Sequence, residues 1–285
     1  MNNKAITIQM FYPTGDTRGF RIAEVTNTII EALLVPRKEL EQILSTREEL
    51  KSSGIYFLFG KDTDDINKKV EAYIGESEVL CDRLRKHNKE KDFWDVAVVF
   101  ISSNQRWQLN KADIKHLEHV SYNKAMEARR YSLNQTIPKL SEVTEAREAD
   151  LNALIEIIEI LLSALGYPLF KALVTKEEKS DKNEQIFYMT SRNSDAKGIY
   201  TNEGFVVLSG SKITTKEKGQ SFNKNHLLVE LKDNRILNEE GEFKEDFLFS
   251  SPSTAASIIG KAKFNGWTVW KNKLGKTLDE IYRIN

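Results

Sequence analysis

Cysteine is almost absent from this chain of 285 residues, which contains only Cys81. A single thiol cannot close an internal disulfide, so a fold stabilised by disulfide bridges is excluded and a reducing compartment is favoured. The first five residues (MNNKA) also lack the apolar core of a signal peptide. We therefore expect a cytoplasmic protein.

Long apolar runs are missing as well. The most apolar segment, 151–167, is interrupted by Asn152, Glu156 and Glu159. It is also shorter than the roughly 20 residues that a membrane-spanning helix needs. We expect no membrane partner.

Neither sign of charge is in excess, because 42 basic residues are balanced by 42 acidic ones. A neutral chain has no global field that attracts nucleic acid, so any surface for nucleic acid must be local. The length allows two domains, each with its own core. Four segments are expected: 1–50, 51–137, 138–170 and 171–285.

The N-terminal segment, 1–50, contains short β and α elements. Residues 5–25 alternate roughly between apolar and polar around Pro-Thr-Gly-Asp at 13–16, which predicts a hairpin. A strand over 28–35 follows, and Pro36 is suited to open a helix. The segment is too small to fold alone, so we expect it to contact the next one.

The second segment, 51–137, predicts a small mixed α/β domain with a three-stranded sheet flanked by helices. Its expected elements are strands at 54–59, 70–75 and 96–101 and helices at 79–87 and 110–128. Between the first two strands, residues 61–69 are highly charged and predict an exposed loop.

The third segment, 138–170, predicts a helical connector. Its leucines and isoleucines follow helical spacing from Leu151 to Leu165, so one face should be buried. That face is expected to contact a neighbouring domain. The alternative is that the helix 151–165 forms a dimer interface.

The last segment, 171–285, predicts a second α+β domain, which makes the whole chain α+β. Strands are expected at 186–190, 197–201, 204–209, 226–231 and 266–271, and a helix at 253–259. Residues 277–283 are compatible with either a strand or a helix.

Two tripeptides and a basic helix stand out in the second segment. Gly54-Ile55-Tyr56 and Tyr73-Ile74-Gly75 each place a tyrosine on an expected strand. Arg83 and His87 are four residues apart and therefore share one helix face. The run 83–91 holds five basic residues and one acid, which suits a phosphate backbone.

Taken singly, these residues have ordinary structural interpretations. The tripeptide Gly-Ile-Tyr occurs again at 198–200 without a following Tyr-Ile-Gly or an Arg/His helix, so it carries no meaning alone. The ordered set Gly54-Ile55-Tyr56, Tyr73-Ile74-Gly75, Arg83, His87, Glu118 and Asn134 resembles the GIY-YIG endonuclease family. The sequences FWD at 93–95, GFVVL at 204–208 and SSPS at 250–253 are similar to a bacterial subgroup of that family that has a C-terminal domain of unknown function.

The resemblance implies a role for each position. Tyr56 would be the general base, Tyr73 would support the nucleophilic water, and Asn134 would orient the substrate or a tyrosine. Glu118 would be the one protein ligand of a single Mg²⁺ or Mn²⁺. It lies at the edge of its helix's expected buried stripe, where a carboxylate is costly unless it is paired or binds a cation.

The chemistry of these residues is compatible with the resemblance. Phosphodiester hydrolysis needs a base, positive charge at the phosphoryl oxygens and stabilisation of the leaving oxygen. Arg83 can bind a phosphate through two hydrogen bonds, and His87 can donate to it or relay a proton. Contacts to the substrate are also expected from Arg85, Lys86 and Lys89.

The sequence thus favours a metal-dependent endonuclease, with DNA favoured over RNA as substrate. The alternative is a nucleic-acid-binding protein whose nuclease half is weak or silent. In that case the C-terminal domain would recognise the target, since its pattern from Ser251 to Trp270 is similar to small modules attached to restriction and modification enzymes. Trp267 and Trp270 would then be core aromatics or a stacking platform for bases.

Overall fold

The computed structural model describes residues 5–61, 69–104, 107–133, 136–175, 178–179 and 185–283. These residues form two compact units, and the chain passes from one to the other between Lys171 and Ala172. The first three expected segments thus fall within one unit. Most of the expected loop at 61–69 lies outside the described residues, and so does Asn134.

The first unit is organised around a seven-stranded sheet, counting only described residues. In their order across the sheet, its strands are β1 (Ile8–Phe11), β2 (Arg21–Val25), β3 (Ile30–Pro36), β6 (Trp94–Ser102), β4 (Gly54–Gly60), β5 (Glu71–Ser77) and β7 (Ser132–Leu133). Neighbouring strands are antiparallel, except that β5 and β7 are parallel.

The sheet therefore has more strands than the three that the sequence predicted. Its strands β6, β4 and β5 are present, but β3 pairs with β6 along its whole length, from Ile30 opposite Ser102 to Pro36 opposite Val96. The predicted hairpin, β1 and β2, continues the same sheet. The run 30–35 is apolar at most positions because both faces of this strand are covered.

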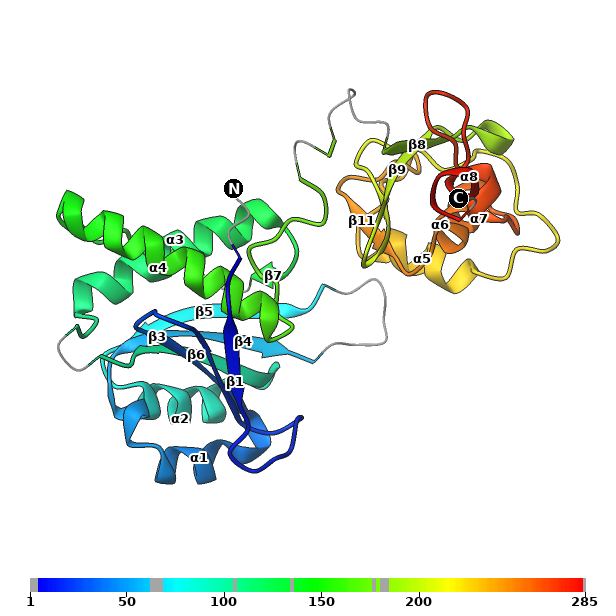
Figure 1. The fold of residues 1–285 in the computed structure, drawn as a ribbon. Helices are drawn as coiled ribbons and strands as arrows, with labels where there is room; N and C mark the ends of the chain where they lie inside the picture. Colours follow the sequence, from blue (N-terminus) through cyan, green and yellow to red (C-terminus); the bar gives the residue numbers. More distant parts are fainter. Residues whose placement is uncertain are drawn as a thin grey trace. The chain divides into compact units, whose positions relative to one another are not determined.

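Helices cover both faces of this sheet (Figure 1). They are η1 (Arg37–Glu39), α1 (Leu40–Thr46), η2 (Glu48–Lys51), α2 (Leu80–Glu90), α3 (Lys111–Ala128) and α4 (Glu145–Ala164). In β4, Ile55, Phe57 and Phe59 face the core beneath α3 and α4. Tyr56 and Leu58 alternate with them and face the opposite core, beneath α1 and α2.

Helix α4 is part of this first unit. Its apolar residues, including Leu151, Ile158 and Leu161, are buried in the same core as β4 and α3, as the helical spacing predicted. The face on which the dimer alternative was based is covered by the helix's own unit, and a dimer through this helix stays a prediction.

A buried ion pair joins α3 to α4. Asn110 caps α3, and its side chain accepts hydrogen bonds from the backbone of Ala112 and Asp113. The carboxylate of Asp113 is fully buried and accepts two hydrogen bonds from Arg147 of α4, at 2.9 and 2.7 Å. This contact fixes the start of the helix that carries Glu118.

The second unit contains a four-stranded antiparallel sheet in the order β11-β10-β9-β8. Its elements are β8 (Ile186–Met189), η3 (Ser191–Asn193), β9 (Ala196–Thr201), β10 (Gly204–Val207), α5 (Asn225–Asp233), β11 (Phe247–Phe249), α6 (Pro252–Gly260), α7 (Gly266–Val269) and α8 (Leu278–Tyr282). The expectation of an α+β chain is confirmed.

Two expected strands of this unit are helices. Residues 226–231 belong to α5, whose Leu227, Leu228 and Leu231 are buried on one helical face. Residues 266–269 form the short helix α7, because the Asn265 side chain accepts a hydrogen bond from the Trp267 backbone and starts a turn. The ambiguous segment 277–283 contains α8.

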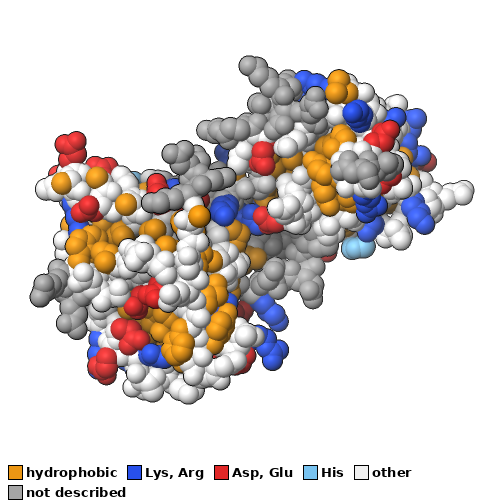
Figure 2. All heavy atoms as spheres, viewed as in Figure 1, with side chains coloured by type: hydrophobic (Ala, Val, Ile, Leu, Met, Phe, Trp, Pro, Cys, Tyr) orange, Lys and Arg blue, Asp and Glu red, His pale blue; other side chains and the backbone are white. Residues whose placement is uncertain are grey.

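No helix in the described parts of the chain is long and apolar enough to cross a membrane. On the face that Figure 2 presents, acidic and basic side chains are interspersed. A basic surface must therefore be sought in local clusters.

Candidate active site

The two glycines of the tripeptides allow close contacts that a side chain would prevent. A Cβ at Gly54 would lie 2.3 Å from the carbonyl oxygen of Phe100. A Cβ at Gly75 would lie 2.3 Å from both Cζ and the hydroxyl oxygen of Tyr56. Tyr56 is directly opposite Gly75 in the β4–β5 pair. Glycine at 75 therefore provides the space that the phenol group of Tyr56 occupies.

The Tyr56 hydroxyl lies between two side chains of α2. Its oxygen is 2.7 Å from Nε2 of His87, and Nε of Arg83 donates to it over 3.1 Å. Tyr56 has no exposed surface, and His87 is 2% exposed. Residues predicted on a strand and on one helix face thus form a single buried hydrogen-bonded group.

Tyr73 lies next to this group and is half-buried. Its ring centroid is 6.3 Å from that of Tyr56 and 5.2 Å from that of His87. The ammonium group of Lys91 lies 4.4 Å from the centroid of the Tyr73 ring. Arg83 and His87 share one face of α2, and Lys91 follows directly after the helix ends at Glu90.

Burial keeps both members of the Tyr56–His87 pair neutral at pH 7. Desolvation, followed by the neighbouring Tyr73, raises the pKa of Tyr56 well above its ordinary value, although Arg83 acts in the opposite direction. Burial and then the charges of Arg83 and Lys91 lower the pKa of His87 to about 4. The neutral Tyr56 hydroxyl therefore donates its hydrogen bond to Nε2 of His87 over 2.7 Å.

His87 has one further unusual feature. Its Nδ1 atom is buried and has no hydrogen-bond partner among the described residues. An unpaired buried polar atom is costly, and such atoms are concentrated at functional sites.

Glu118 of α3 is half-buried, as its position at the edge of the buried stripe predicted. Burial, followed by repulsion from Glu76, raises its pKa to about 7, although Arg83 and Lys111 act in the opposite direction. Glu76 itself accepts hydrogen bonds from the Lys111 ammonium group at 2.8 and 2.9 Å. The charge of Glu118 also raises the pKa of Tyr56, so its carboxylate is near the tyrosine group.

The environment of the Glu118 carboxylate favours a divalent cation, but few other protein ligands are available to it. A half-buried carboxylate with a raised pKa is stabilised by a nearby cation. However, the described residues contain no group of three or more His, Cys, Asp or Glu side chains that could hold a metal ion. The residues therefore fit a hard cation that is bound through one carboxylate and keeps most of its ligands as water or substrate, and they do not form a cage.

The three predicted substrate contacts on α2 differ in their partners. Arg85 pairs with Glu41 at 3.3 Å, and Lys86 with Glu90 at 3.9 Å. Lys89 is exposed and forms no ion pair within the described part of the chain. Lys91 is not among the residues predicted from the sequence, although it lies eight residues after Arg83 in the same basic run.

Trp270, in the second unit, cannot act as the predicted stacking platform. It is fully buried, and its indole N–H donates to the carbonyl oxygen of Pro252 over 3.1 Å. Spacing alone did not indicate which way this ring faces. Trp267 is half-buried, and the guanidinium group of Arg283 lies 3.4 Å from the centroid of its ring.

The comparison with family models concerns this second unit. Residues 187–282 match a domain of unknown function, DUF4357. The match extends from β8 into α8, and a C-terminal domain of unknown function agrees with the predicted subgroup. No GIY-YIG family model matches the chain. No curated protein and no solved structure matches it either.

Proposed function

We propose that the first unit is an endonuclease that hydrolyses phosphodiester bonds of nucleic acid, with DNA as the preferred substrate. The observation that carries this proposal is the position of the Tyr56 hydroxyl, 2.7 Å from His87 and 3.1 Å from Arg83. A second tyrosine and the carboxylate of Glu118 adjoin this group. Tyrosine, arginine, histidine and carboxylate together supply the proton transfer and the charge that this reaction requires.

Arg83 binds the phosphoryl oxygens of the scissile phosphate. Its guanidinium group has no carboxylate partner among the described residues, so no carboxylate there neutralises its charge. Nε donates to Tyr56, and the side chain also hydrogen-bonds to Tyr73, so the two tyrosines hold the guanidinium group in position for the phosphate. Lys91, which also has no carboxylate partner among the described residues, binds a flanking phosphate.

Tyr56 acts as the general base through His87. A neutral phenol cannot accept a proton from water unless it releases its own, and Nε2 of His87 is the acceptor within hydrogen-bond distance. The pKa of about 4 makes His87 a weak acceptor in the free protein. A bound phosphate anion near Arg83 and His87 raises that pKa, so proton transfer becomes favourable only with substrate present.

Tyr73 positions the water. It is half-buried, whereas Tyr56 has no exposed surface, so Tyr73 is the tyrosine that meets solvent first. This difference also defines an alternative in which Tyr73 itself accepts the proton. Comparing Tyr56→Phe with Tyr73→Phe distinguishes the two, because the base shows the larger loss in turnover and the positioning residue the smaller.

Glu118 would hold one Mg²⁺ or Mn²⁺, which when bound would supply Lewis-acid stabilisation of the charge on the leaving 3′ oxygen. The pKa of about 7 means that Glu118 is only partly ionised at neutral pH, and cation binding favours the ionised form.

A cleavage panel tests this proposal. The full chain is incubated with single-stranded and double-stranded DNA and RNA, with Mg²⁺, with Mn²⁺ and without a divalent cation. We expect metal-dependent cleavage of DNA that leaves a 5′-phosphate. Glu118→Ala should abolish it, and Glu127→Ala, an exposed position on the same helix, should not. Equal activity of wild type and Glu118→Ala would exclude the proposed chemistry.

A further inference from the structure

The C-terminal end of α2 is bound by an arginine from the N-terminal segment. Arg37 follows directly after strand β3, at the start of η1. Its Nε donates to the side-chain oxygen of Asn88 over 2.9 Å, and its Nη2 donates to the Asn88 carbonyl over 2.8 Å. Its Nη1 donates to the carbonyls of Asp92 and Trp94, each over 3.1 Å. The same guanidinium group lies 4.9 Å from the centroid of the Trp94 ring.

These contacts satisfy backbone groups that the helix itself leaves open. The last four carbonyls of an α-helix have no partner within the helix, and Asn88 is among the last four residues of α2. A cation at this end also interacts favourably with the helix dipole. The fully buried indole of Trp94 donates to the carbonyl of His87 over 3.4 Å. The carbonyls of His87 and Asn88 are therefore both bound by side chains from outside the helix.

The end of α2 determines where the His87 ring lies. Nε2 of His87 is 2.7 Å from the hydroxyl oxygen of Tyr56, which belongs to strand β4. This hydrogen bond joins the helix to the sheet, so it forms only while α2 keeps its place along the sheet. Arg37 follows β3 of the same sheet and binds the end of α2. A displacement of about 1 Å would break the hydrogen bond, and errors of that size can cost about 100-fold in rate.

Two further contacts join the N-terminal segment to α2, which lies on the same face of the sheet as α1 (Figure 1). At the start of the helix, the backbone N–H of Leu80 donates to the Ser52 carbonyl over 3.2 Å. Arg85 pairs with Glu41 at 3.3 Å, but the Glu41 side chain is 64% exposed, and such a pair contributes little. The Arg37 side chain is 23% exposed and makes four hydrogen bonds, so it is the strongest of these contacts.

Arginine is suited to this position. A guanidinium group directs five N–H donors in one plane, whereas the ammonium group of lysine carries three donors on a flexible stem. Within the described part of the chain, Arg37 makes no hydrogen bond to Tyr56, Arg83 or His87. Any effect of Arg37 on these residues therefore passes through α2.

We propose that Arg37 is a positioning residue for the candidate active site, which holds the end of α2 so that His87 stays within hydrogen-bond distance of Tyr56. The N-terminal segment is then a working part of the first unit. The effect of Arg37 on cleavage rests on the proposed function, whereas its effect on the Tyr56–His87 hydrogen bond does not.

The first readout is ¹⁵N NMR of the histidine rings in the full chain. The chain has four histidines, so a His87→Gln spectrum identifies the His87 resonances. R37M should move the Nε2 resonance of His87 in the direction in which Y56F moves it, because both changes remove the hydrogen bond to that nitrogen. R47M is the matched control: Arg47 comes from the same segment and also lies 4.9 Å from an aromatic ring, that of Phe20. It should leave the resonance in place.

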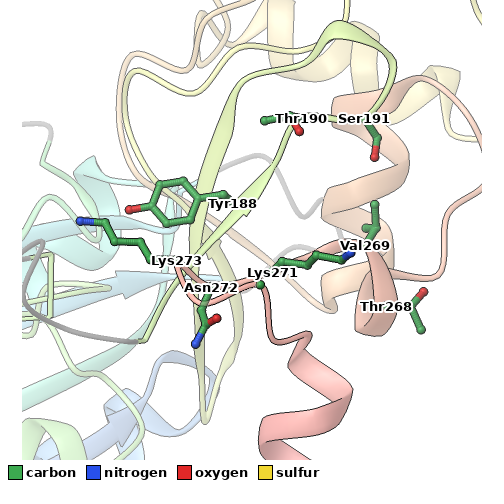
Figure 3. A pocket seen from close by; sticks show the side chains of 9 residues that line it. Tyr188, Thr190, Ser191, Thr268, Val269, Lys271, Asn272 and Lys273 are labelled. Atoms are coloured by element: carbon green, nitrogen blue, oxygen red, sulfur yellow. The ribbon is translucent and has the colours of Figure 1, made fainter.

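The second readout is single-turnover cleavage of DNA in Mg²⁺ at saturating protein, at a temperature where circular dichroism shows every variant to be folded. R37M should slow cleavage about tenfold or more, and R37K should recover only part of that loss. R47M should cleave as wild type does. T268A is the control outside the first unit, because Thr268 borders a hollow of the second unit (Figure 3) that contains no residue of the candidate site.

The inference is overturned if folded R37M keeps the wild-type His87 resonances, or if R37M and R47M move them equally. Cleavage by R37M at the wild-type rate would overturn it as well. If R37M does not fold, R37K decides: a displaced Nε2 resonance supports the inference, and the wild-type resonance overturns it. A displaced resonance in R37M, combined with no cleavage by wild type, would contradict only the proposed nuclease.

Discussion

Glu118 links the pH dependence of stability to the proposed metal site. Burial and Glu76 raise its pKa to about 7, above the ordinary value of 4.5. Folding therefore favours its protonated form. That contribution to stability is fully present below pH 4.5 and is lost as the pH rises through 7.

The first prediction is that Glu118→Gln is more stable than wild type at pH 8, by about 1–2 kcal/mol after allowance for partial exposure. The difference should disappear near pH 4. Thermal unfolding of metal-free protein between pH 4 and pH 9 measures it. Glu127→Gln is the exposed control on the same helix. A difference that does not change with pH would contradict the assigned environment of Glu118.

The second prediction concerns the lysine over the Tyr73 ring. Lys91→Met should weaken substrate binding and lower the salt slope by about 1, with little change in turnover, because Lys91 is proposed to bind a flanking phosphate. Lys139→Met, an exposed lysine that is not among the predicted substrate contacts, is the control. KM and kcat measured at several salt concentrations separate the effects. If both variants behaved alike, Lys91 would have no special role.

The candidate site could be predicted from sequence where local geometry fixes it. Arg83 and His87 share a face because they are four apart, and Tyr56 occurs on a strand next to that helix. The contact of Lys91 with Tyr73 depends on the direction of one ring, which spacing does not determine. The same limitation explains the error at Trp270, whose ring points inward.

At the scale of the elements, the pairing of β4 with β5 places Gly75 beside the Tyr56 phenol and leaves room for its hydroxyl to contact His87. The third prediction is that Gly75→Ala destabilises the protein by about 1–3 kcal/mol, because its Cβ would overlap the Tyr56 phenol. It should also abolish any cleavage by displacing the hydroxyl. Gly19→Ala, whose Cβ would meet no atom closer than 3.4 Å, is the control. Chemical denaturation measures both variants, and unchanged stability of Gly75→Ala would be inconsistent with the packing described.

The junction of α3 and α4 gives the fourth prediction. Arg147→Met leaves the Asp113 carboxylate buried without its main partner and should cost about 3–5 kcal/mol. Adding Asp113→Asn should recover part of that loss. Although burial opposes ionisation, Arg147 and the Asn110 backbone lower the pKa of Asp113, so this stabilisation is lost in acid below its ordinary pKa of 3.8. A double-mutant cycle by urea unfolding at pH 7 tests the pair, and additive effects would contradict it.

The mistaken elements show the limits of periodicity. The sequence HLLVEL at 226–231 is apolar enough for a strand, yet its three leucines also fit one helical face, and tertiary contacts select the helix. Strand β3 was predicted, but its pairing with β6 was not, because sheet membership depends on contacts between residues that are distant in sequence. The helix from Asn110 to Ala128 was predictable because its capping residues act locally.

At the scale of the whole molecule, balanced charge restricts the proposed binding of nucleic acid to local surfaces. The basic face of α2 is the surface proposed for the first unit. Composition could not indicate it, since the 42 basic and 42 acidic residues cancel. The boundary near Lys171 was suggested by a change in sequence character, whereas the inclusion of 1–50 in the first unit required the β3–β6 pairing.

The most direct test of the central claim is single-turnover cleavage of DNA in Mg²⁺ by wild type, Tyr56→Phe and Tyr12→Phe. Tyr12 follows β1, outside the candidate site. We predict that Tyr56→Phe cleaves at least about 100-fold more slowly than wild type at a temperature where both are folded, with unchanged DNA affinity, while Tyr12→Phe is unaffected. Cleavage by Tyr56→Phe at the wild-type rate, or no cleavage by wild type, would contradict the account.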